Sequence, residues 1–339
     1  MLFNKQKIEN ALKAFKRGEM IIVADDNSRE NEGDLVVAAQ FCTTEQMAFI
    51  IRHSSGIVCT PMSQQRAVDL ELPPMVENNS SAYHTAFTIS VDCKEGTTTG
   101  ISAYERALTA RKLADKKAVA GDFIRPGHVF PLTARNFGVL TRSGHTEAAV
   151  DLCLLCDLQP VAIIGELMND DGTVQNQNEL DEFAQNHKLQ LITIADLILY
   201  RQHTEKIVKC LDKKQKNICG KEVVQFQYDI GNNVYDVVDF GVNCDNTAIY
   251  ISQDYICDNE FINLAKKYKR IICIIYKINE KSNLAEQHKH AINREVFWNK
   301  YGSIAQILKD FSFEKFKIVS NHSAEEQKIY EELISNNGK

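Results

Sequence analysis

Long apolar runs are missing from this 339-residue chain, and no uninterrupted stretch reaches the length that spans a bilayer. An excess of positive charge is missing too, because 39 Lys and Arg stand against 45 Asp and Glu, for a net charge of -6. We therefore expect neither nucleic acid nor a membrane as a partner. The N-terminal residues show no apolar signal-peptide core, which predicts a cytoplasmic protein.

Closely spaced cysteine pairs are almost absent. The chain has ten cysteines, spread widely, and Cys153 with Cys156 is the one close pair. A C-x-x-C spacing can mark a redox or zinc site. The pair lies in the apolar run 152–155, where buried thiols that pack as small hydrophobic groups are the simpler interpretation.

Proline and glycine are scarce in the last third of the chain. All six prolines lie at or before Pro160, and five of the sixteen glycines follow residue 204. A chain of this length is expected to form two domains. We place them at 1–204 and 205–339, and expect the catalytic loops in the first, which is rich in turn residues.

Hydrophobic periodicity and capping residues predict an α+β first domain with a mixed sheet. Thr43 with Gln46 and Ser102 with Glu105 are capping boxes. The expected helices begin near 8, 44, 103, 178 and 194, the second ends at Gly56, and the third runs to about 117. The expected strands are 20–23, 57–59, 161–167 and 190–193.

The remainder has a weaker pattern that predicts a smaller α/β domain. Its expected strands are 223–228, 234–240, 248–252, 271–276 and 315–320. Its expected helices are 261–268 and 301–311. The pair His288 and His290 suggests a metal site, but an exposed turn or helix is the simpler interpretation.

The segment 25–34 is the most informative one. It places five carboxylates within ten residues directly after an apolar strand. Such charges repel one another, and burying them without a cation would be costly. A hard divalent ion such as Mg²⁺ prefers carboxylate oxygens and would resolve the conflict. A solvated acidic loop is the alternative.

The segment 142–147 suggests an anion site. If a helix begins at Thr146, its free N–H groups attract a phosphate, Gly144 allows close approach and Arg142 supplies paired donors. His145 can then bind the metal held by the acidic segment. A simple helix cap with a surface histidine is the alternative.

Two further residues are candidates for proton transfer. His128 lies between two prolines in 125–131, which we expect to be a rigid loop that suits a general acid or base. Glu166 follows the apolar strand 161–165, where half-burial would raise its pKa toward that of a useful base. Taken singly, a structural histidine and a solvated glutamate are the simpler interpretations.

Taken together, these segments closely resemble 3,4-dihydroxy-2-butanone 4-phosphate synthases. The resemblance covers about residues 5–203. The motifs that carry it are RENEGD (29–34), RHSSGIVC (52–59), MVENN (75–79), RPGHVFP (125–131), RSGHTE (142–147) and ELMNDDGT (166–173).

The resemblance implies a lyase of riboflavin biosynthesis that converts D-ribulose 5-phosphate into L-3,4-dihydroxy-2-butanone 4-phosphate and formate. It implies an α+β fold, a homodimer and two Mg²⁺ or Mn²⁺ ions per active site, with Glu30 and His145 as ligands. His128 and Glu166 become the residues essential for proton transfer. The implied substrate contacts are Arg29, Glu30, Asp34, Arg142, Ser143, Gly144, His145, Thr146 and Glu166.

The tail is similar to a late part of GTP cyclohydrolase II in the stretches 301–310 and 317–321. The zinc-binding run of that family is missing, because Cys244 and Cys257 stand apart, and so is its arginine-bearing, glycine-rich catalytic segment. We therefore expect a degenerate second domain without cyclohydrolase activity. A bifunctional enzyme, or a tail that serves as a binding or assembly module, remains the alternative.

Overall fold

The computed structural model describes residues 4–25, 29–205, 209–218, 221–230, 233–241, 247–252, 264, 266–277, 304, 306–308, 311 and 316–318. Contacts divide the chain into two compact units, the first up to Tyr200 and the second from Arg201. Among the described residues, no helix is long and apolar enough to cross a membrane.

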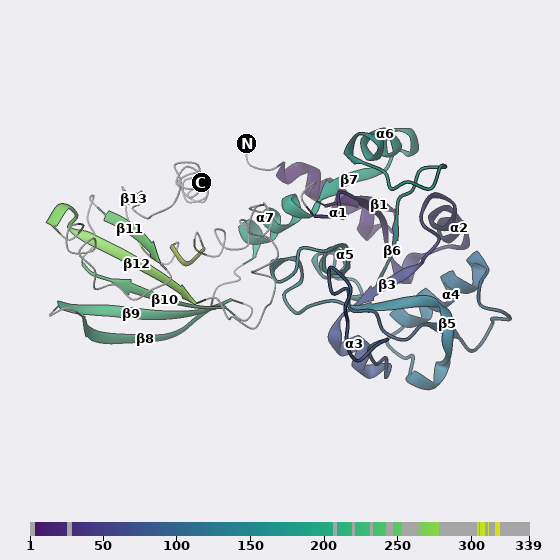
Figure 1. The fold of residues 1–339 in the computed structure, drawn as a ribbon, viewed down its shortest axis with the longest axis horizontal. Helices are drawn as coiled ribbons and strands as arrows, with labels where there is room; N and C mark the ends of the chain where they lie inside the picture. Colours follow the sequence, from purple (N-terminus) through teal and green to yellow (C-terminus); the bar gives the residue numbers. More distant parts are fainter. Residues whose placement is uncertain are drawn as a thin grey trace. The chain divides into compact units, whose positions relative to one another are not determined.

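The described part of the chain up to Thr204 contains seven α-helices, three short 3₁₀ helices and seven strands (Figure 1). Its helices are α1 (Lys5–Lys16), α2 (Thr44–His53), α3 (Gln64–Asp69), α4 (Ala103–Ala114), α5 (His145–Leu155), α6 (Gln177–His187) and α7 (Ile194–Thr204). Its strands are β1 (Ile21–Ala24), β2 (Gly33–Ala38), β3 (Cys59–Met62), β4 (Val91–Cys93), β5 (Phe123–Thr133), β6 (Ala162–Glu166) and β7 (Gln190–Thr193).

These strands form one mixed sheet in the order β4-β5-β3-β6-β2-β1-β7. β1 pairs with β7, and β3 with β5, in parallel; the other pairs are antiparallel. Every residue of β1 and β2 is buried. Both faces of the sheet centre are therefore covered, which explains the continuous apolar runs in place of strict alternation. The predicted α+β class with a mixed sheet is confirmed.

Both predicted capping boxes are present. The Thr43 hydroxyl accepts the Gln46 N–H and the Gln46 side chain accepts the Thr43 N–H; Ser102 and Glu105 repeat the arrangement. Such a cap satisfies helix N–H groups that have no partner inside the helix. The predicted ends were less accurate. α2 stops at His53, before Gly56, α4 stops at Ala114, and β3 begins at Cys59.

The close cysteine pair is buried, as the packing interpretation predicts. The Cys153 thiol contacts the Val161 carbonyl, and the Cys156 thiol donates to the Leu12 carbonyl at 3.3 Å. Burial raises the pKa of both thiols, to about 11 for Cys156. A neutral, buried thiol is a poor metal ligand and a poor nucleophile.

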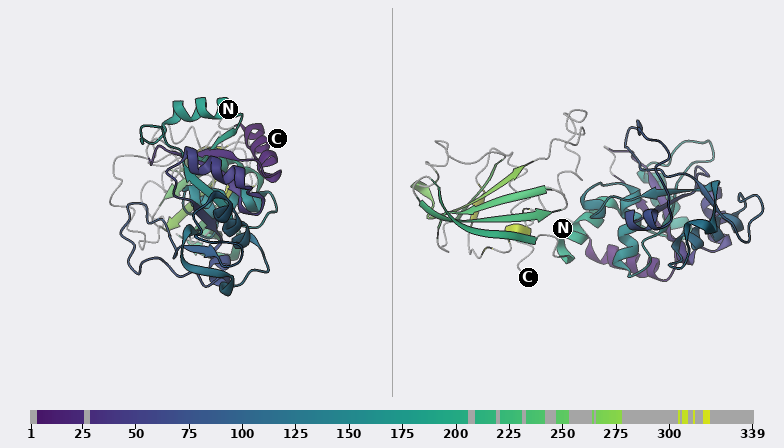
Figure 2. Two further views of the ribbon diagram at one scale, coloured as in Figure 1. Left: turned by 90° about the vertical axis from the view of Figure 1, so that its right-hand side faces the viewer. Right: turned by 90° about the horizontal axis from the view of Figure 1, so that it is seen from below.

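The second unit contains a six-stranded sheet in its described part, in the order β13-β11-β12-β10-β9-β8. Most of its strands are the green arrows in the right-hand view of Figure 2. The strands are β8 (Lys209–Ile218), β9 (Lys221–Ile230), β10 (Asn233–Asp239), β11 (Thr247–Ser252), β12 (Arg270–Lys277) and β13 (Phe316–Ile318). All five predicted strands correspond to β9–β13, and β8 was missed because its residues are largely polar and exposed. Buried side chains of β9–β12 form a separate core.

Most of the two predicted helices of the tail lies outside the described residues. The same holds for His288, His290, Cys244 and Cys257.

Candidate active site

The acidic segment forms one wall of a cavity because three neighbouring strands end there. Asp25 follows β1, Asp34 is the second residue of β2, and Glu166 ends β6. In the strand register Asp34 lies opposite both Val23 and Glu166. The backbone pairing of β1, β2 and β6 therefore brings together carboxylates that are far apart in the sequence.

Asp25 organises the turn between β1 and β2. Its carboxylate accepts the backbone N–H groups of Glu30 and Glu32, at 3.1 and 2.9 Å, and a guanidinium N–H of Arg29 at 2.9 Å. Asp25 is buried, so these bonds compensate its charge. These bonds hold Glu30 and Glu32 at Asp25, and Glu30 faces His145 at the start of α5.

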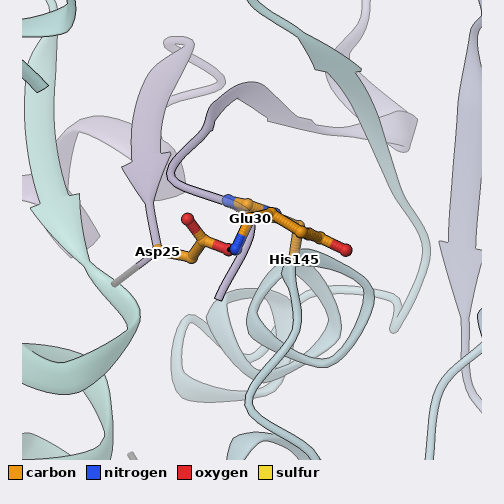
Figure 3. Close-up of side chains that lie close together, drawn as sticks. All are labelled: Asp25, Glu30 and His145. Carbon is orange, nitrogen blue, oxygen red and sulfur yellow. Dashed lines mark hydrogen bonds and ion pairs between the residues drawn. The ribbon is translucent and has the colours of Figure 1, made fainter. Parts of the chain in front are cut away.

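Glu30, Asp25 and His145 converge at one point. Figure 3 shows them arriving from the loop after β1, the end of β1 and the first residue of α5. One ligand atom from each lies within 4.8 Å of the others, which makes the three a possible metal-binding group. Glu30 and His145 were predicted from the sequence. Asp25 was missed as a member of the group, although it begins the acidic run.

The His145 ring has a defined orientation. Its Nε2 lies 3.1 Å from the Val23 carbonyl, which can only accept, so Nε2 carries the proton and Nδ1 has a free lone pair. Nδ1 lies 3.9 Å from Glu30 and 3.8 Å from Asp34. Burial lowers the pKa of His145 to about 4, so the ring is neutral near pH 7 and can act as a metal ligand.

Asp34 has a buried oxygen that lacks a hydrogen-bond partner in the described part of the chain. Burial first, and then the neighbouring Glu166, Glu32 and Glu30, raise the pKa of Asp34 well above its ordinary value. An unpaired buried carboxylate oxygen is costly unless a cation binds it.

The pKa values of the neighbouring carboxylates Glu30 and Glu32 are raised as well. Burial is the main cause that raises the pKa of Glu30, with Arg29 opposing it. Burial and the charge of Glu166 raise the pKa of Glu32 to about 7.

Ligand atoms on one Mg²⁺ at about 2.1 Å lie at most about 4.2 Å apart. The separations of His145 Nδ1 from Glu30 and from Asp34 lie within this limit, so His145 can share a divalent ion with either carboxylate.

The opposite wall begins at the N-terminus of α5. The helix starts at His145, one residue before the predicted Thr146, with Gly144 as its N-cap and no side chain capping it. Its first N–H groups are thus available to an anion. A Cβ atom at Gly144 would lie 2.3 Å from a guanidinium nitrogen of Arg142, so only glycine leaves that side chain in place.

Arg142 is held by three groups that the sequence did not single out. It donates to the buried Glu147 carboxylate at 2.6 Å. Its other terminal nitrogen donates to the Tyr83 carbonyl and the Thr85 hydroxyl, each at 3.2 Å. These bonds fix the orientation of the guanidinium beside the start of α5.

The cavity between these walls has a volume of about 130 Å³. Of the predicted site residues, seven line it: Arg29, Glu30, Asp34, Arg142, His145, Thr146 and Glu166. Ser55, Cys59, Thr85 and Phe87 also line it and were not predicted. A cavity of about 490 Å³ shares Thr85 and Phe87 but has no carboxylate cluster, so the smaller one is the candidate site.

Two predicted features of the proton-transfer residues are wrong. Glu166 is exposed at the end of β6, not half-buried. Residues 125–131 lie within strand β5, not in a loop, because Gly127 packs directly against the backbone of β4. The two prolines are accommodated in that strand.

His128 does not line the cavity within the described chain. Its Nδ1 lies 2.7 Å from the buried Asp92, which also accepts the His128 backbone N–H at 2.8 Å. A carboxylate on Nδ1 fixes the tautomer and leaves Nε2 as the reactive atom. The side chain is 42% exposed, so Nε2 is accessible.

Comparisons with known proteins all indicate the same family. Residues 9–200 match the family model of 3,4-dihydroxy-2-butanone 4-phosphate synthase. The chain is 37% identical over 321 residues to the protein of that name from Wolinella succinogenes, covering 94% of this chain and 92% of the relative.

Solved structures agree. The chain is similar to the crystal structure of RibBX, a two-domain 3,4-dihydroxy-2-butanone 4-phosphate synthase from A. baumannii, with a TM-score of 0.79, 33% identity and 94% of each chain covered. It is also similar to a synthase of the same name in complex with two magnesium ions. That match has a TM-score of 0.58 and 46% identity, over 58% of this chain and 97% of the other.

Proposed function

Because the chain belongs to the 3,4-dihydroxy-2-butanone 4-phosphate synthase family, we propose which residues of its cavity bind the metal ions and the substrate and which residues transfer protons. The chain is an enzyme of riboflavin biosynthesis. The substrate is D-ribulose 5-phosphate, and the products are L-3,4-dihydroxy-2-butanone 4-phosphate and formate. The observation that carries the assignment is the meeting of carboxylates, His145 and Arg142 around one cavity.

Glu30 and His145 are the proposed metal ligands, and Asp34 faces the same point. Support comes from the unpaired oxygen of Asp34, the free lone pair of His145 and the two magnesium ions bound by a relative. Mg²⁺ or Mn²⁺ fits this oxygen-rich set. When bound, two such ions supply Lewis-acid stabilisation of negative charge on substrate oxygens.

The substrate phosphate binds at the start of α5. The N–H groups of the first turn attract the anion, and Gly144 lets it approach the backbone. Ser143 precedes the N-cap Gly144 and Thr146 is the second residue of α5, and the guanidinium of Arg142 clamps the phosphate. This contact fixes the register of the sugar chain along the cavity without taking part in the chemistry.

Proton transfers are assigned to Glu166, which lines the cavity, and to His128 on the strength of the family resemblance, since His128 does not line the cavity of the described chain. Glu166 lies at the cavity wall opposite Asp34 in the sheet, where a carboxylate can take a proton from a bound sugar. His128, aligned by Asp92, offers an accessible ring nitrogen. Arg29 and Asp34 complete the substrate contacts, and each acid–base group is expected to contribute about 10²–10⁴-fold.

Formate release from D-ribulose 5-phosphate, with and without Mg²⁺, tests this assignment. Metal-dependent formate is expected, together with a large loss on Glu30→Gln or His145→Ala. An active protein indifferent to chelation would contradict the metal site. The absence of formate under all metal conditions would contradict the activity itself.

For the second unit we propose a degenerate GTP cyclohydrolase II-like domain, residues 205–339, without cyclohydrolase activity. The support is the missing thiolate run in the sequence and the high coverage of a two-domain synthase. Formate release from GTP would instead favour a bifunctional enzyme.

An assembly module is the other candidate for the tail. We also propose a homodimer and a cytoplasmic location, both supported by the resemblance to the family. Light scattering on the full chain and on a protein truncated at about residue 204 distinguishes these roles. A truncated protein that stays dimeric and active has a dispensable tail, whereas a monomeric one assigns assembly to the tail.

A further inference from the structure

Tyr83 contacts both walls of the cavity, although it belongs to neither the acidic segment nor the α5 turn. Its hydroxyl donates to the Arg29 carbonyl at 2.8 Å. The Arg29 guanidinium lies over its ring, 4.9 Å from the centroid. Its own backbone carbonyl accepts an N–H from Arg142 at 3.2 Å. We propose that Tyr83 is a positioning residue whose side chain, through Arg29, couples the segment that carries it to the metal-binding loop.

The segment that carries Tyr83 is braced internally. The Asn79 side chain donates to the Thr85 carbonyl at 2.8 Å and accepts from both the N–H and the hydroxyl of Ser81. At its base, Thr88 bonds to the Pro131 carbonyl and Met75 to the Phe87 carbonyl. A segment held at both ends can transmit a constraint from one contact to another.

The contact with Arg29 acts on the metal-binding loop. Arg29 bonds to the carboxylates of Asp25 and Glu30. Its side chain is largely buried, so its position sets that of Glu30. Tyr83 fixes Arg29 twice, through the backbone carbonyl and through the face of the ring. Outer groups that orient metal ligands commonly change metal affinity by about 10–100-fold when removed.

The contact with Arg142 acts on the phosphate side and uses only the backbone of Tyr83. The neighbouring Thr85 hydroxyl strengthens it. A side-chain substitution at Tyr83 therefore removes the link to Arg29 and keeps the acceptor for Arg142. This separation makes the proposal testable, since a loss of general structure would damage both walls.

The test compares Tyr83→Phe and Tyr83→Leu in the full-length protein. Phe keeps the ring under Arg29 and loses the hydroxyl, whereas Leu loses both. We expect the dissociation constant for Mg²⁺, measured by calorimetry on the protein alone, to rise about fivefold for Phe and about tenfold for Leu. We expect the KM for ribulose 5-phosphate at saturating Mg²⁺ to stay within about twofold.

Tyr104, an exposed residue of α4, supplies the matched control. Tyr104→Phe and Tyr104→Leu should leave both constants unchanged. Equal Mg²⁺ affinity in wild-type protein and both Tyr83 variants would overturn the proposal, as would a KM that rises more than the Mg²⁺ constant. If Tyr83→Leu fails to fold, Tyr83→Phe alone decides.

This inference rests on the proposed function, and the two can fail separately. Wild-type protein without metal-dependent formate release refutes the function. Active wild-type protein with unaltered Mg²⁺ binding in the Tyr83 variants refutes only the coupling.

Discussion

On the α5 side of the cavity Arg142 is paired with a carboxylate, whereas on the side of β1 and β2 the carboxylates outnumber Arg29, which pairs with Asp25 and Glu30. Arg142 has a buried carboxylate partner, Glu147, and two further acceptors. Asp34 has a buried oxygen without a hydrogen-bond partner in the described structure, and its carboxylate neighbours raise its pKa. On the proposed assignment, the phosphate side is complete within the chain and the carboxylate side binds a cation.

This difference separates two ways of building a binding site. The phosphate side uses a helix start, which the backbone supplies at no cost in charge. The carboxylate side stores unfavourable desolvation that metal binding relieves. Substitutions on the two sides should therefore have opposite effects on the stability of the protein without metal.

Asp34→Asn is expected to have the largest effect. Formate release should fall by about 10²-fold or more, since several kcal/mol of metal-dependent stabilisation are lost. In chelator, the melting temperature should rise, because a buried carboxylate with a raised pKa is replaced by a neutral amide.

Asp181→Asn, at an exposed position of α6, is the control and should alter neither quantity. A lower melting temperature for Asp34→Asn in chelator would show that the carboxylate side is not strained.

Arg142→Gln should raise the KM for ribulose 5-phosphate by about 10²-fold and lower the melting temperature. The second effect follows because the buried Glu147 loses its ion-pair partner and keeps only the Arg135 backbone N–H. Adding Glu147→Gln should restore much of the stability and none of the KM. Arg17→Gln, at an exposed arginine, serves as control. Recovery of KM in the double variant would refute the clamp.

Gly144→Ala is a milder test of the same side. The new methyl group would meet the guanidinium of Arg142, so the KM should rise by about tenfold with Mg²⁺ affinity unchanged. Gly121→Ala, where a Cβ atom meets nothing within 4 Å, is the matched control. A change in Mg²⁺ affinity as large as that in KM would mean that the two sides are not separable this way.

The pH dependence is the smallest expected effect. The pKa of Glu32 is raised to about 7, so without metal the folded protein holds a proton that the unfolded chain releases near 4.5. Stability in chelator should therefore fall as pH rises from about 4.5 to 7. Mg²⁺ binding should displace that proton, and its apparent affinity should rise about fivefold between pH 6 and 7.

Calorimetry in two buffers of different ionisation enthalpy measures the released proton directly. Binding without proton release at pH 6.5 would show that the carboxylates are already ionised.

Local sequence was sufficient for elements whose caps and periodicity agree. Thr43 and Ser102 marked their helices because the capping groups lie within the same four residues. β7 was predicted to its ends for a similar reason, being bounded by two helices. The segment around His128 was misassigned because its strand pairing depends on β4, which lies more than 30 residues away.

The same distinction, between local signals and long-range contacts, applies to the site residues. Glu30, His145 and Arg142 stood in long, unusual motifs and were predicted from them. Tyr83 and Asp92 act through contacts with distant residues, and their types at those positions are unremarkable in a sequence. Only their hydrogen bonds, to Arg29 and His128, reveal them.

The sequence by itself determined the class of fold and the family, whereas the domain boundary at residue 204 and the roles of the site residues stay predictions. The fold class and the family follow from residue types at short spacing, because periodicity and motifs can be interpreted without knowledge of the folded structure. The tertiary structure decided which carboxylate remains unpaired, which nitrogen of His145 is free and which side chain bonds to the Arg29 carbonyl. Those properties depend on burial and on long-range pairing of β1, β2 and β6, which exist only once the chain has folded.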